Sequence, residues 1–245
     1  SKQVNDHEVV YTGTGLPTVA AILAKKTHAP PITFVYESGG QDPIAGGMPW
    51  SVGGPETYRK SPMIMEMAYS FGQAAGGLVD TGFLGFAQLD MYGNANTTMI
   101  GDNFLNPKVR LTGSGGNNDV GSLCEKLVFV GIQSPQKFVQ KCDFITTTGH
   151  MVDGVSRKDL GILGGGPVAV VSTAGVYDFD PATKRMRMKT LHPGVSADLA
   201  QLATGFELLR PSGEIPVTEV PSKEILEILR HEVDPQGFFI TMPGA

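Results

Sequence analysis

The segment FVYESGGQDP, residues 34–43, changes character at Glu37. β-Forming residues precede Glu37 and small, glycine-rich residues follow it, so a strand over Ile32 to Tyr36 is expected to end at a carboxylate in a loop. Upstream lie a short predicted strand at His7 to Tyr11, a TGTGLP turn and a predicted helix at Thr18 to Lys26. This order favours a parallel βαβ unit. Glu37 is therefore predicted at the carboxyl end of a parallel strand, where open α/β sheets bind their ligands.

The rest of the chain alternates between helix and strand patterns. A helix is expected over Met63 to Gly72, with strands over Leu78 to Leu84, Leu127 to Ile132 and Phe144 to Thr147. Antiparallel ribbon is expected from Val168 to Ser172 and Arg185 to Lys189, followed by helices over Ala197 to Ala203 and Lys223 to Glu232. The pattern predicts an α/β fold, with an open, mostly parallel sheet, helices on both faces and an antiparallel appendage in the C-terminal third. Residues 1–245 are expected to form a single domain, because no long linker interrupts them.

The amino-acid composition disfavours several classes of protein. The 245 residues are 41% hydrophobic and 18% charged, as in an ordinary globular protein, and no apolar run approaches the roughly 18 residues of a membrane-spanning helix. The net charge of −5, without blocks of like charge, gives no reason to expect nucleic acid as a partner. Cys124 and Cys142 stand apart from any metal-ligand spacing, so we expect reduced, buried thiols, no metal and a cytoplasmic location. The chain opens on Ser1 rather than Met, so some N-terminal sequence is expected to be missing.

Two glycine-rich stretches could form a site. Ser38 and Gly39 have little bulk and leave space in front of the Glu37 carboxylate, although a solvated loop acid would have the same sequence context. Residues 112–118, TGSGGNN, offer consecutive backbone N–H groups that could bind an anion or an oxyanion, although such stretches are also ordinary turns. GxxxxGK[ST] and GxSxG are both absent, which disfavours phosphate transfer and serine hydrolysis.

Several motifs, in order along the chain, carry a family resemblance. They are TGTGLP (12–17), the A-K-x-x-x-AP pattern (24–30), VYESG (35–39), AQLDMYGNAN (87–96), IGD (100–102), RLTGSGGNN (110–118) and EVDPQGFFI (232–240). Together they resemble the β subunit of family I CoA-transferases of the glutaconate CoA-transferase type. The resemblance implies a fold related to that of sugar-phosphate isomerases. It also implies an α-type partner subunit, in a heterodimer that assembles to α2β2 or higher.

The resemblance assigns roles to individual residues. Glu37 matches the catalytic glutamate, with Ser38 and Gly39 beside it, Gly115 and Gly116 match a glycine pair whose backbone lies against the thioester, and Gln88 falls in a loop beside the site. Two departures are visible: the helix before the first strand is absent, and Phe86 stands where a glycine usually precedes the Ala-Gln pair.

The implied reaction moves CoA from an acyl-CoA, of a dicarboxylic acid such as glutaconate, to an acceptor carboxylate such as acetate. It proceeds by ping-pong chemistry through a glutamyl-CoA thioester on Glu37. No permanent cofactor is expected, because CoA is the substrate and is transiently bound as a covalent thioester. The alternative is an acyl-CoA hydrolase or decarboxylase subunit on the same scaffold, and a third interpretation is a non-catalytic subunit whose site lies in a partner chain.

Overall fold

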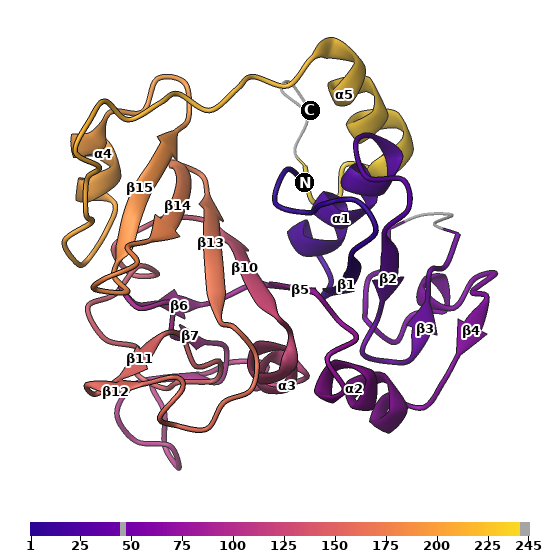
Figure 1. Ribbon diagram of the computed structural model, residues 1–245, viewed down its shortest axis with the longest axis horizontal. Coiled ribbons are helices and arrows are strands. Elements are labelled where there is room, and N and C mark those ends of the chain that lie inside the picture. Colours follow the sequence, from indigo (N-terminus) through magenta and orange to yellow (C-terminus); the bar gives the residue numbers. More distant parts are fainter. Residues whose placement is uncertain (45–47, 241–245) are drawn as a thin grey trace. The chain divides into compact units, whose positions relative to one another are not determined.

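The chain forms two compact units, which are described separately (Figure 1). The computed structural model describes residues 1–44 and 48–240. Unit 1 contains residues 1–83 and the segment that begins at Val220, and unit 2 contains Leu84–Glu219. Within the described ranges, no helix is long and apolar enough to cross a membrane. The expectation that residues 1–245 act as a single domain stays a prediction.

Unit 1 is built on a mixed sheet with a parallel core. Its strands are β1 (Val9–Thr12), β2 (Thr33–Val35), β3 (Gly40–Gln41), β4 (Met63–Ile64) and β5 (Thr81–Leu84), in the order β5-β1-β2-β3-β4. β1 is parallel to both neighbours, so that Tyr11 lies opposite Val35 on one side and Gly82 on the other. β3 and β4 extend the sheet in antiparallel fashion. The parallel βαβ unit predicted around Glu37 is therefore present.

Helices α1 (Leu16–Lys26) and α2 (Met67–Ala75) cover opposite faces of this sheet. The Tyr11 ring stacks on Phe71 of α2, with ring centroids 5.5 Å apart. The hydroxyl of Thr12, the next residue of β1, lies 3.4 Å from the Thr18 hydroxyl of α1. Since successive strand residues point to opposite faces, the two helices must lie on opposite sides of the sheet.

The C-terminal segment of unit 1 returns to α1. α5 (Lys223–Ile228) is capped by Ser222, whose hydroxyl accepts a hydrogen bond from the Ile225 N–H. A π-helical turn, Leu229–Val233, follows it. Glu232 from this turn forms an exposed ion pair with Lys26 at the end of α1.

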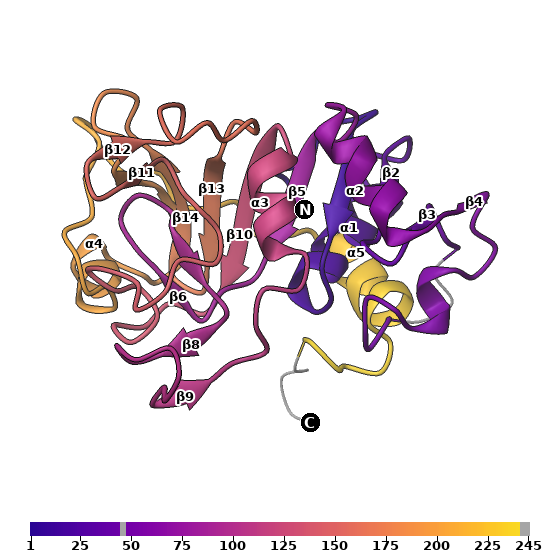
Figure 2. The same ribbon diagram turned by 90° about the horizontal axis from the view of Figure 1, so that it is seen from below.

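The four longest strands of unit 2 include one parallel pair. β10 (Lys126–Gly131) runs parallel to β13 (Pro167–Ser172), and β14 (Gly175–Phe179) and β15 (Met186–Leu191) follow as an antiparallel appendage. Around these strands lie α3 (Asn117–Leu123), α4 (Ala197–Leu202) and the ribbons β6–β7 (Gln88–Leu89, Ala95–Asn96), β8–β9 (Met99–Ile100, Val109–Arg110) and β11–β12 (Met151–Val152, Val155–Ser156) (Figure 2). The predicted fold class is confirmed.

Three predicted elements were wrong in detail. Met63 and Ile64 do not begin a helix, because they pair with β3 as the edge strand β4 and α2 starts only at Met67. The region 144–147 is not a strand, because only Thr147 forms a single bridge, to Ala95. The two ribbon strands expected at Val168 to Ser172 and Arg185 to Lys189 do not pair directly, because an additional strand, β14, lies between them. In each case strand pairing, which depends on residues distant in sequence, decides the local structure.

The core of unit 2 depends on aromatic packing around β10. Replacing the fully buried Phe129 with alanine should lower the free energy of unfolding by about 3–5 kcal/mol, because a large cavity would remain in the core. Phe104, which is half exposed, provides the control, and its alanine variant should cost less than about 1 kcal/mol. Urea denaturation would measure both, and equal losses would contradict this account of the core.

Candidate functional site

The Glu37 turn connects β2 to β3 at the carboxyl end of a parallel strand. The Tyr36 carbonyl accepts a hydrogen bond from the Gly39 N–H at 2.9 Å, and the Tyr36 N–H donates to the Gly40 carbonyl at 3.0 Å. Glu37 and Ser38 are thus the two central residues of a tight turn, and both are partly exposed. A carboxylate at this position is held by the fold at the edge where open α/β sheets bind ligands.

Hydrogen bonds from other parts of unit 1 brace this turn. The Ser38 hydroxyl donates to the Val52 carbonyl at 2.5 Å, and the Tyr58 hydroxyl donates to the Ser38 carbonyl at 3.1 Å. The Met65 N–H donates to the Gly39 carbonyl at 3.1 Å. The backbone that follows Glu37 is therefore fixed by segments that lie well beyond the turn in sequence.

Gly39 and Gly40 serve backbone packing. Gly39 has φ of +104°, and a Cβ there would overlap the Met65 carbonyl oxygen, while a Cβ at Gly40 would overlap the Thr57 carbonyl oxygen. Glycine is needed at both positions because two backbone segments approach too closely for any side chain. The sequence analysis attributed the small residues to space for a reacting group, and the structure adds this steric reason.

A buried hydrogen-bond chain supports the turn from the α2 face. The Tyr11 and Ser70 hydroxyls lie 2.6 Å apart, and Ser70 Oγ donates to the Tyr36 carbonyl at 3.2 Å. On Tyr36 itself, burial raises the pKa of the phenol to about 12, against an opposing effect of its hydrogen bond with Thr18. Tyr36 is therefore a neutral structural residue. Sequence reasoning missed Tyr11 and Ser70, because nothing in their local context shows that they meet.

The second predicted group, Gly115 and Gly116, lies in unit 2 at the start of α3. Gly115 has φ of +50°, and no atom lies within 4 Å of the position that a Cβ there would occupy. No acceptor among the described residues is hydrogen-bonded to the N–H of Gly115 or Gly116. Backbone donors of this kind suit an oxyanion.

Thr97 anchors this glycine loop at both ends. Its carbonyl accepts from the Gly113 N–H at 3.0 Å, and its hydroxyl donates to the Gly113 carbonyl at 2.9 Å. The same hydroxyl accepts from Asn117 Nδ2 at 3.1 Å. Thr97 is thus a positioning residue that the sequence analysis did not single out.

Gln88, the remaining predicted site residue, is buried in β6 of unit 2. Its Oε1 accepts from Asn96 Nδ2 at 2.8 Å and from the Asp143 N–H at 2.9 Å. These bonds tie the β6–β7 ribbon together and attach it to residue 143. A role in substrate binding stays a prediction. Phe86, which stands where the family usually has a glycine, belongs to the core and packs edge-on against Phe129 and Phe138.

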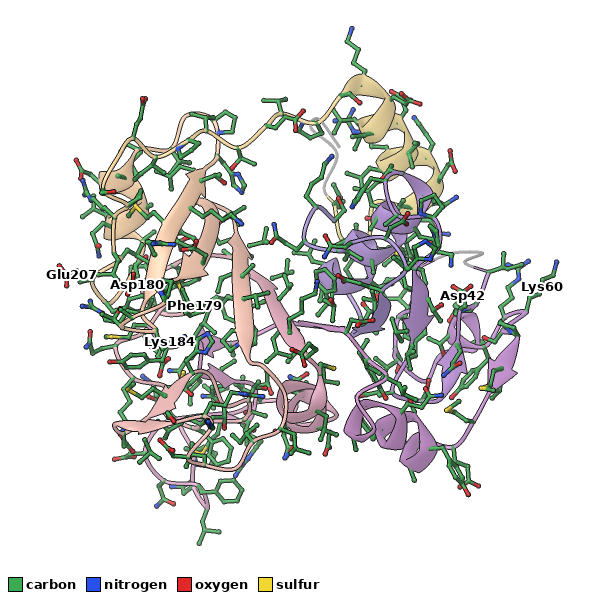
Figure 3. The ribbon with its side chains drawn as sticks, viewed as in Figure 1. Asp42, Lys60, Phe179, Asp180, Lys184 and Glu207 are labelled. Carbon is green, nitrogen blue, oxygen red and sulfur yellow. The ribbon has the colours of Figure 1, made fainter. Side chains whose placement is uncertain are left out.

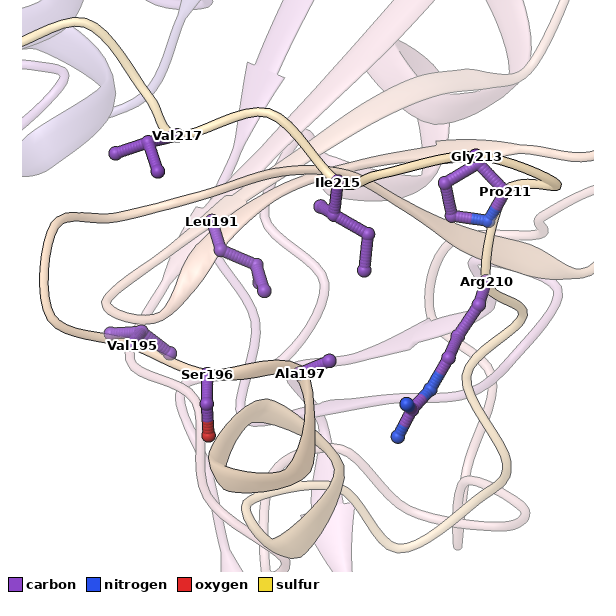
Figure 4. Close-up of a pocket in the computed structure, with 9 residues that line it drawn as sticks. All are labelled: Leu191, Val195, Ser196, Ala197, Arg210, Pro211, Gly213, Ile215 and Val217. Atoms are coloured by element: carbon purple, nitrogen blue, oxygen red, sulfur yellow. The ribbon is translucent and has the colours of Figure 1, made fainter.

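Unit 2 has a cavity of about 620 Å³ beside the glycine loop, lined by Phe86, Ala87, Thr97, Arg110, Leu111 and Thr112. Arg110 lies over the Phe104 ring, with Cζ 4.7 Å from the centroid. A cavity of about 400 Å³ elsewhere in unit 2 is mainly aliphatic (Figure 4). The Arg210 that borders it is paired with Asp198. In the part of the chain that the structure describes, no three His, Cys, Asp or Glu side chains are grouped to hold a metal ion.

Comparison with known proteins gives the family. The family model described as coenzyme A transferase matches residues 1–199. The chain belongs to the coenzyme A transferase family. The B-type subunit of 3-oxoadipate CoA-transferase from Pseudomonas knackmussii is 35% identical over 94% of the chain and 88% of the relative. The B-type subunit of glutaconate CoA-transferase from Acidaminococcus fermentans is 33% identical over 99% of the chain and 92% of the relative.

Solved structures agree with this assignment. The crystal structure of glutaconate CoA-transferase from Acidaminococcus fermentans has a TM-score of 0.90 at 33% identity and covers 99% of the chain and 94% of its own. The decarboxylase AibA/AibB has a TM-score of 0.83 at 26% identity, covering 100% of the chain and 95% of its own. The family resemblance carried by the sequence motifs is therefore confirmed, whereas the roles of Glu37, Ser38, Gly39, Gln88, Gly115 and Gly116 stay predictions.

Close packing at Gly39 can be tested by substitution. Gly39→Ala should lower the free energy of unfolding by about 3 kcal/mol or more, because it combines a backbone clash with an unfavourable φ. Gly77→Ala is the matched control: it also has a positive φ, +74°, but open space around it, so about 1 kcal/mol is expected. If thermal denaturation shows the same loss for both, the contact with the Met65 backbone does not constrain the turn.

Proposed function

We propose that the chain is the β subunit of a CoA-transferase with Glu37 as the covalent nucleophile. The observation that carries this proposal is the braced turn that presents Glu37 at the carboxyl end of β2. Family membership supports it independently. The relatives at 33% and 35% identity carry the names of CoA-transferases for glutaconate and 3-oxoadipate, which are both dicarboxylates. We therefore propose a dicarboxylic acyl-CoA as the donor and a simple carboxylate such as acetate as the acceptor.

The proposed chemistry conserves the thioester bond energy. The Glu37 carboxylate attacks the acyl-CoA carbonyl, which gives a mixed anhydride and releases CoA thiolate. The thiolate then attacks the glutamyl carbonyl, so that the free acid leaves and a glutamyl-CoA thioester remains. An acceptor carboxylate attacks this thioester, and the same two steps in reverse give the new acyl-CoA and restore Glu37. Each attack forms a tetrahedral oxyanion that needs preorganised donors.

The other predicted residues are assigned supporting roles in this proposal. Ser38 and Gly39 hold the turn through their bonds to Val52, Tyr58 and Met65. The N–H groups of Gly115 and Gly116 are suitable oxyanion or thioester donors, since no described residue uses them. Gln88 is proposed to keep the neighbouring ribbon in place through its buried carbonyl.

An α-type subunit is the proposed partner. The two relatives at 33% and 35% identity are each the B-type subunit of their enzymes. We propose a heterodimer that assembles to α2β2 or higher, in the cytoplasm, with CoA as substrate and without a permanent cofactor. The competing candidate is a decarboxylase or hydrolase subunit, because the decarboxylase AibA/AibB shares the fold at 26% identity.

The nucleophile proposal predicts that Glu37→Gln abolishes CoA transfer and leaves stability within about 1 kcal/mol of wild type. The amide matches the carboxylate in size but cannot form an anhydride. In the complex with an α-type partner, in which all variants are compared, wild type incubated with acyl-CoA alone should gain the mass of CoA less one water on the peptide that contains Tyr36 to Ser38. Hydroxylamine should remove this adduct. The mutant should never form this adduct.

Glu66→Gln provides the matched control, since Glu66 is an exposed carboxylate of the same unit and makes no side-chain cap on α2. It should transfer CoA at the wild-type rate. Retained transfer by Glu37→Gln, with its identity confirmed by mass, would refute the role of Glu37. Release of free CoA without an acceptor acid and without an adduct would instead support hydrolysis.

The two-subunit proposal predicts that the purified chain alone transfers CoA poorly or not at all. Co-expression with an α-type partner should restore activity, because the partner supplies the remaining part of the substrate site. The measurement is CoA transfer from glutaconyl-CoA to acetate, with each subunit alone and with both together. Full turnover by the partner-free chain would exclude the two-subunit arrangement.

A further inference from the structure

A third cavity of unit 2, of about 420 Å³, is bordered by basic side chains from three segments of the chain. They are His150, Arg157 and Lys158 around the β11–β12 ribbon, and Lys184 from the β14–β15 connection. Lys184 and Asp180 both lie in that connection, where the Lys184 N–H donates to the Asp180 carbonyl at 2.8 Å (Figure 3). Such convergence of cations is unexpected on a chain with a net charge of −5.

The cations of this cavity differ from several others in unit 2 because they lack acidic partners. Elsewhere, Lys141 pairs with Asp153 at 2.7 Å and Arg187 with Asp178 at 2.9 Å. Within residues 1–44 and 48–240, no carboxylate forms an ion pair with Arg157, Lys158 or Lys184. Their charge is therefore available to a ligand.

Arg157 is held in the wall of this cavity by hydrogen bonds to the backbone. It is 6% exposed, and its three nitrogens donate to backbone carbonyls, at 2.7 Å to Gly164, 2.6 Å to Thr148 and 2.5 Å to Gly121. A guanidinium carries five N–H groups, so two donors remain beyond these three bonds. Burial lowers the pKa of Arg157 to about 10, which still leaves it charged at neutral pH. The fold thus keeps a buried cation in the wall without neutralising it.

His150 adds a second fixed group to the wall. Its Nε2 lies 2.7 Å from the Pro167 carbonyl, so this nitrogen carries the proton and donates. Burial lowers the pKa of His150, and the charges of Lys184 and Arg157 lower it further, against the raising effect of the Pro167 carbonyl. Lys184 and Arg157 therefore both lie close enough to His150 to act on it.

Two carboxylates lie next to the site. Asp159 follows Lys158 and accepts a hydrogen bond at 2.6 Å from the hydroxyl of Ser156, which lines the cavity. A Cβ at Gly165 would lie 3.6 Å from Oε1 of Glu125. Asp180, next to Lys184 in the connection, accepts hydrogen bonds from Thr183 and lies 3.8 Å from Arg187. Three permanent cations thus border a cavity with two carboxylates beside it, and the balance favours an anionic ligand.

We propose that this cavity binds a phosphate ester of an organic compound. Arginine and lysine are the side chains suited to phosphate oxygens, and the two remaining Arg157 donors with the Lys158 and Lys184 ammonium groups would supply them. The cavity is within the size range of small-molecule sites, and Ile162 and Leu163 add an apolar wall for the organic part. The ligand class includes the phosphorylated end of CoA and free nucleotides. This inference does not depend on the chemistry of Glu37, because it concerns binding alone.

The test is calorimetric titration of the full chain with CoA, dephospho-CoA, ADP and inorganic phosphate. The double variant Lys158→Gln/Lys184→Gln should bind CoA or ADP about tenfold more weakly than wild type, because charge-assisted hydrogen bonds are lost. The control Lys189→Gln/Lys223→Gln removes the same charge from exposed positions outside the cavity and should bind as wild type does. Bound phosphate should also raise the pKa of His150, measured by NMR.

Each outcome decides the proposal. If the double variant binds both CoA and ADP more weakly than wild type, the bound part is the nucleotide diphosphate. If only CoA binding is weakened, and wild type already binds dephospho-CoA weakly, the bound part is the 3′-phosphate of CoA. If the control pair weakens binding equally, the effect is general electrostatics and the cavity is not the site. Inorganic phosphate binding as tightly as the esters, or a His150 pKa that does not move, would also overturn the proposal.

Discussion

The close approach of two backbone segments to Gly39 and Gly40 is the constraint on which the Glu37 turn depends. The carbonyl oxygens of Met65 and Thr57 occupy the space that Cβ atoms would need. This approach allows the Met65 N–H to bond to Gly39 and β4 to pair with β3. It also explains why α2 begins two residues after Met65 instead of at Met63, because the chain must first complete the edge strand. The nucleophile proposal therefore rests on a turn whose backbone is fixed before any side-chain contact is considered.

The buried hydrogen bonds that connect Tyr11, Ser70 and the Tyr36 carbonyl also fix the position of the Glu37 turn. Each such hydrogen bond contributes about 1 kcal/mol net, which is small for the stability of the domain, but leaving one of these groups without a partner would cost more. These hydrogen bonds thus hold the end of β2 in one position relative to α2. Geometric precision of this kind is what a covalent nucleophile requires, since small displacements reduce rates strongly.

Sequence reasoning was effective where function depends on local motifs and ineffective where distant segments meet. The run from Ile32 to Tyr36, broken at Glu37, predicted both the parallel strand and the turn. The β-branched and aromatic residues 176–179 did not predict β14, since that strand exists through its pairing with β13 and β15. The roles of Ser70, Tyr58 and Thr97 depend on partners 16 or more positions away, as the Thr97 bond to Gly113 illustrates. No motif records those contacts, so only the three-dimensional structure reveals them.

Three carboxyl groups in the family motifs show how placement separates structural from chemical roles. Asp90 is buried, accepts from the N–H groups of Tyr92 and Asn94 and from Asn94 Nδ2, and burial raises its pKa. Asp234 is 3% exposed and accepts from three successive backbone N–H groups, those of Phe238, Phe239 and Ile240.

Attack through Asp90 or Asp234 would break the turns that they organise. Glu37 differs in that its turn is held by backbone bonds and by the Ser38 and Tyr58 hydroxyls, so the turn does not rely on the Glu37 carboxylate for these bonds. A group that must form and break a covalent bond in every cycle is best placed where the fold survives without it. The backbone bonds of the Glu37 turn meet this requirement and support the proposed role of Glu37.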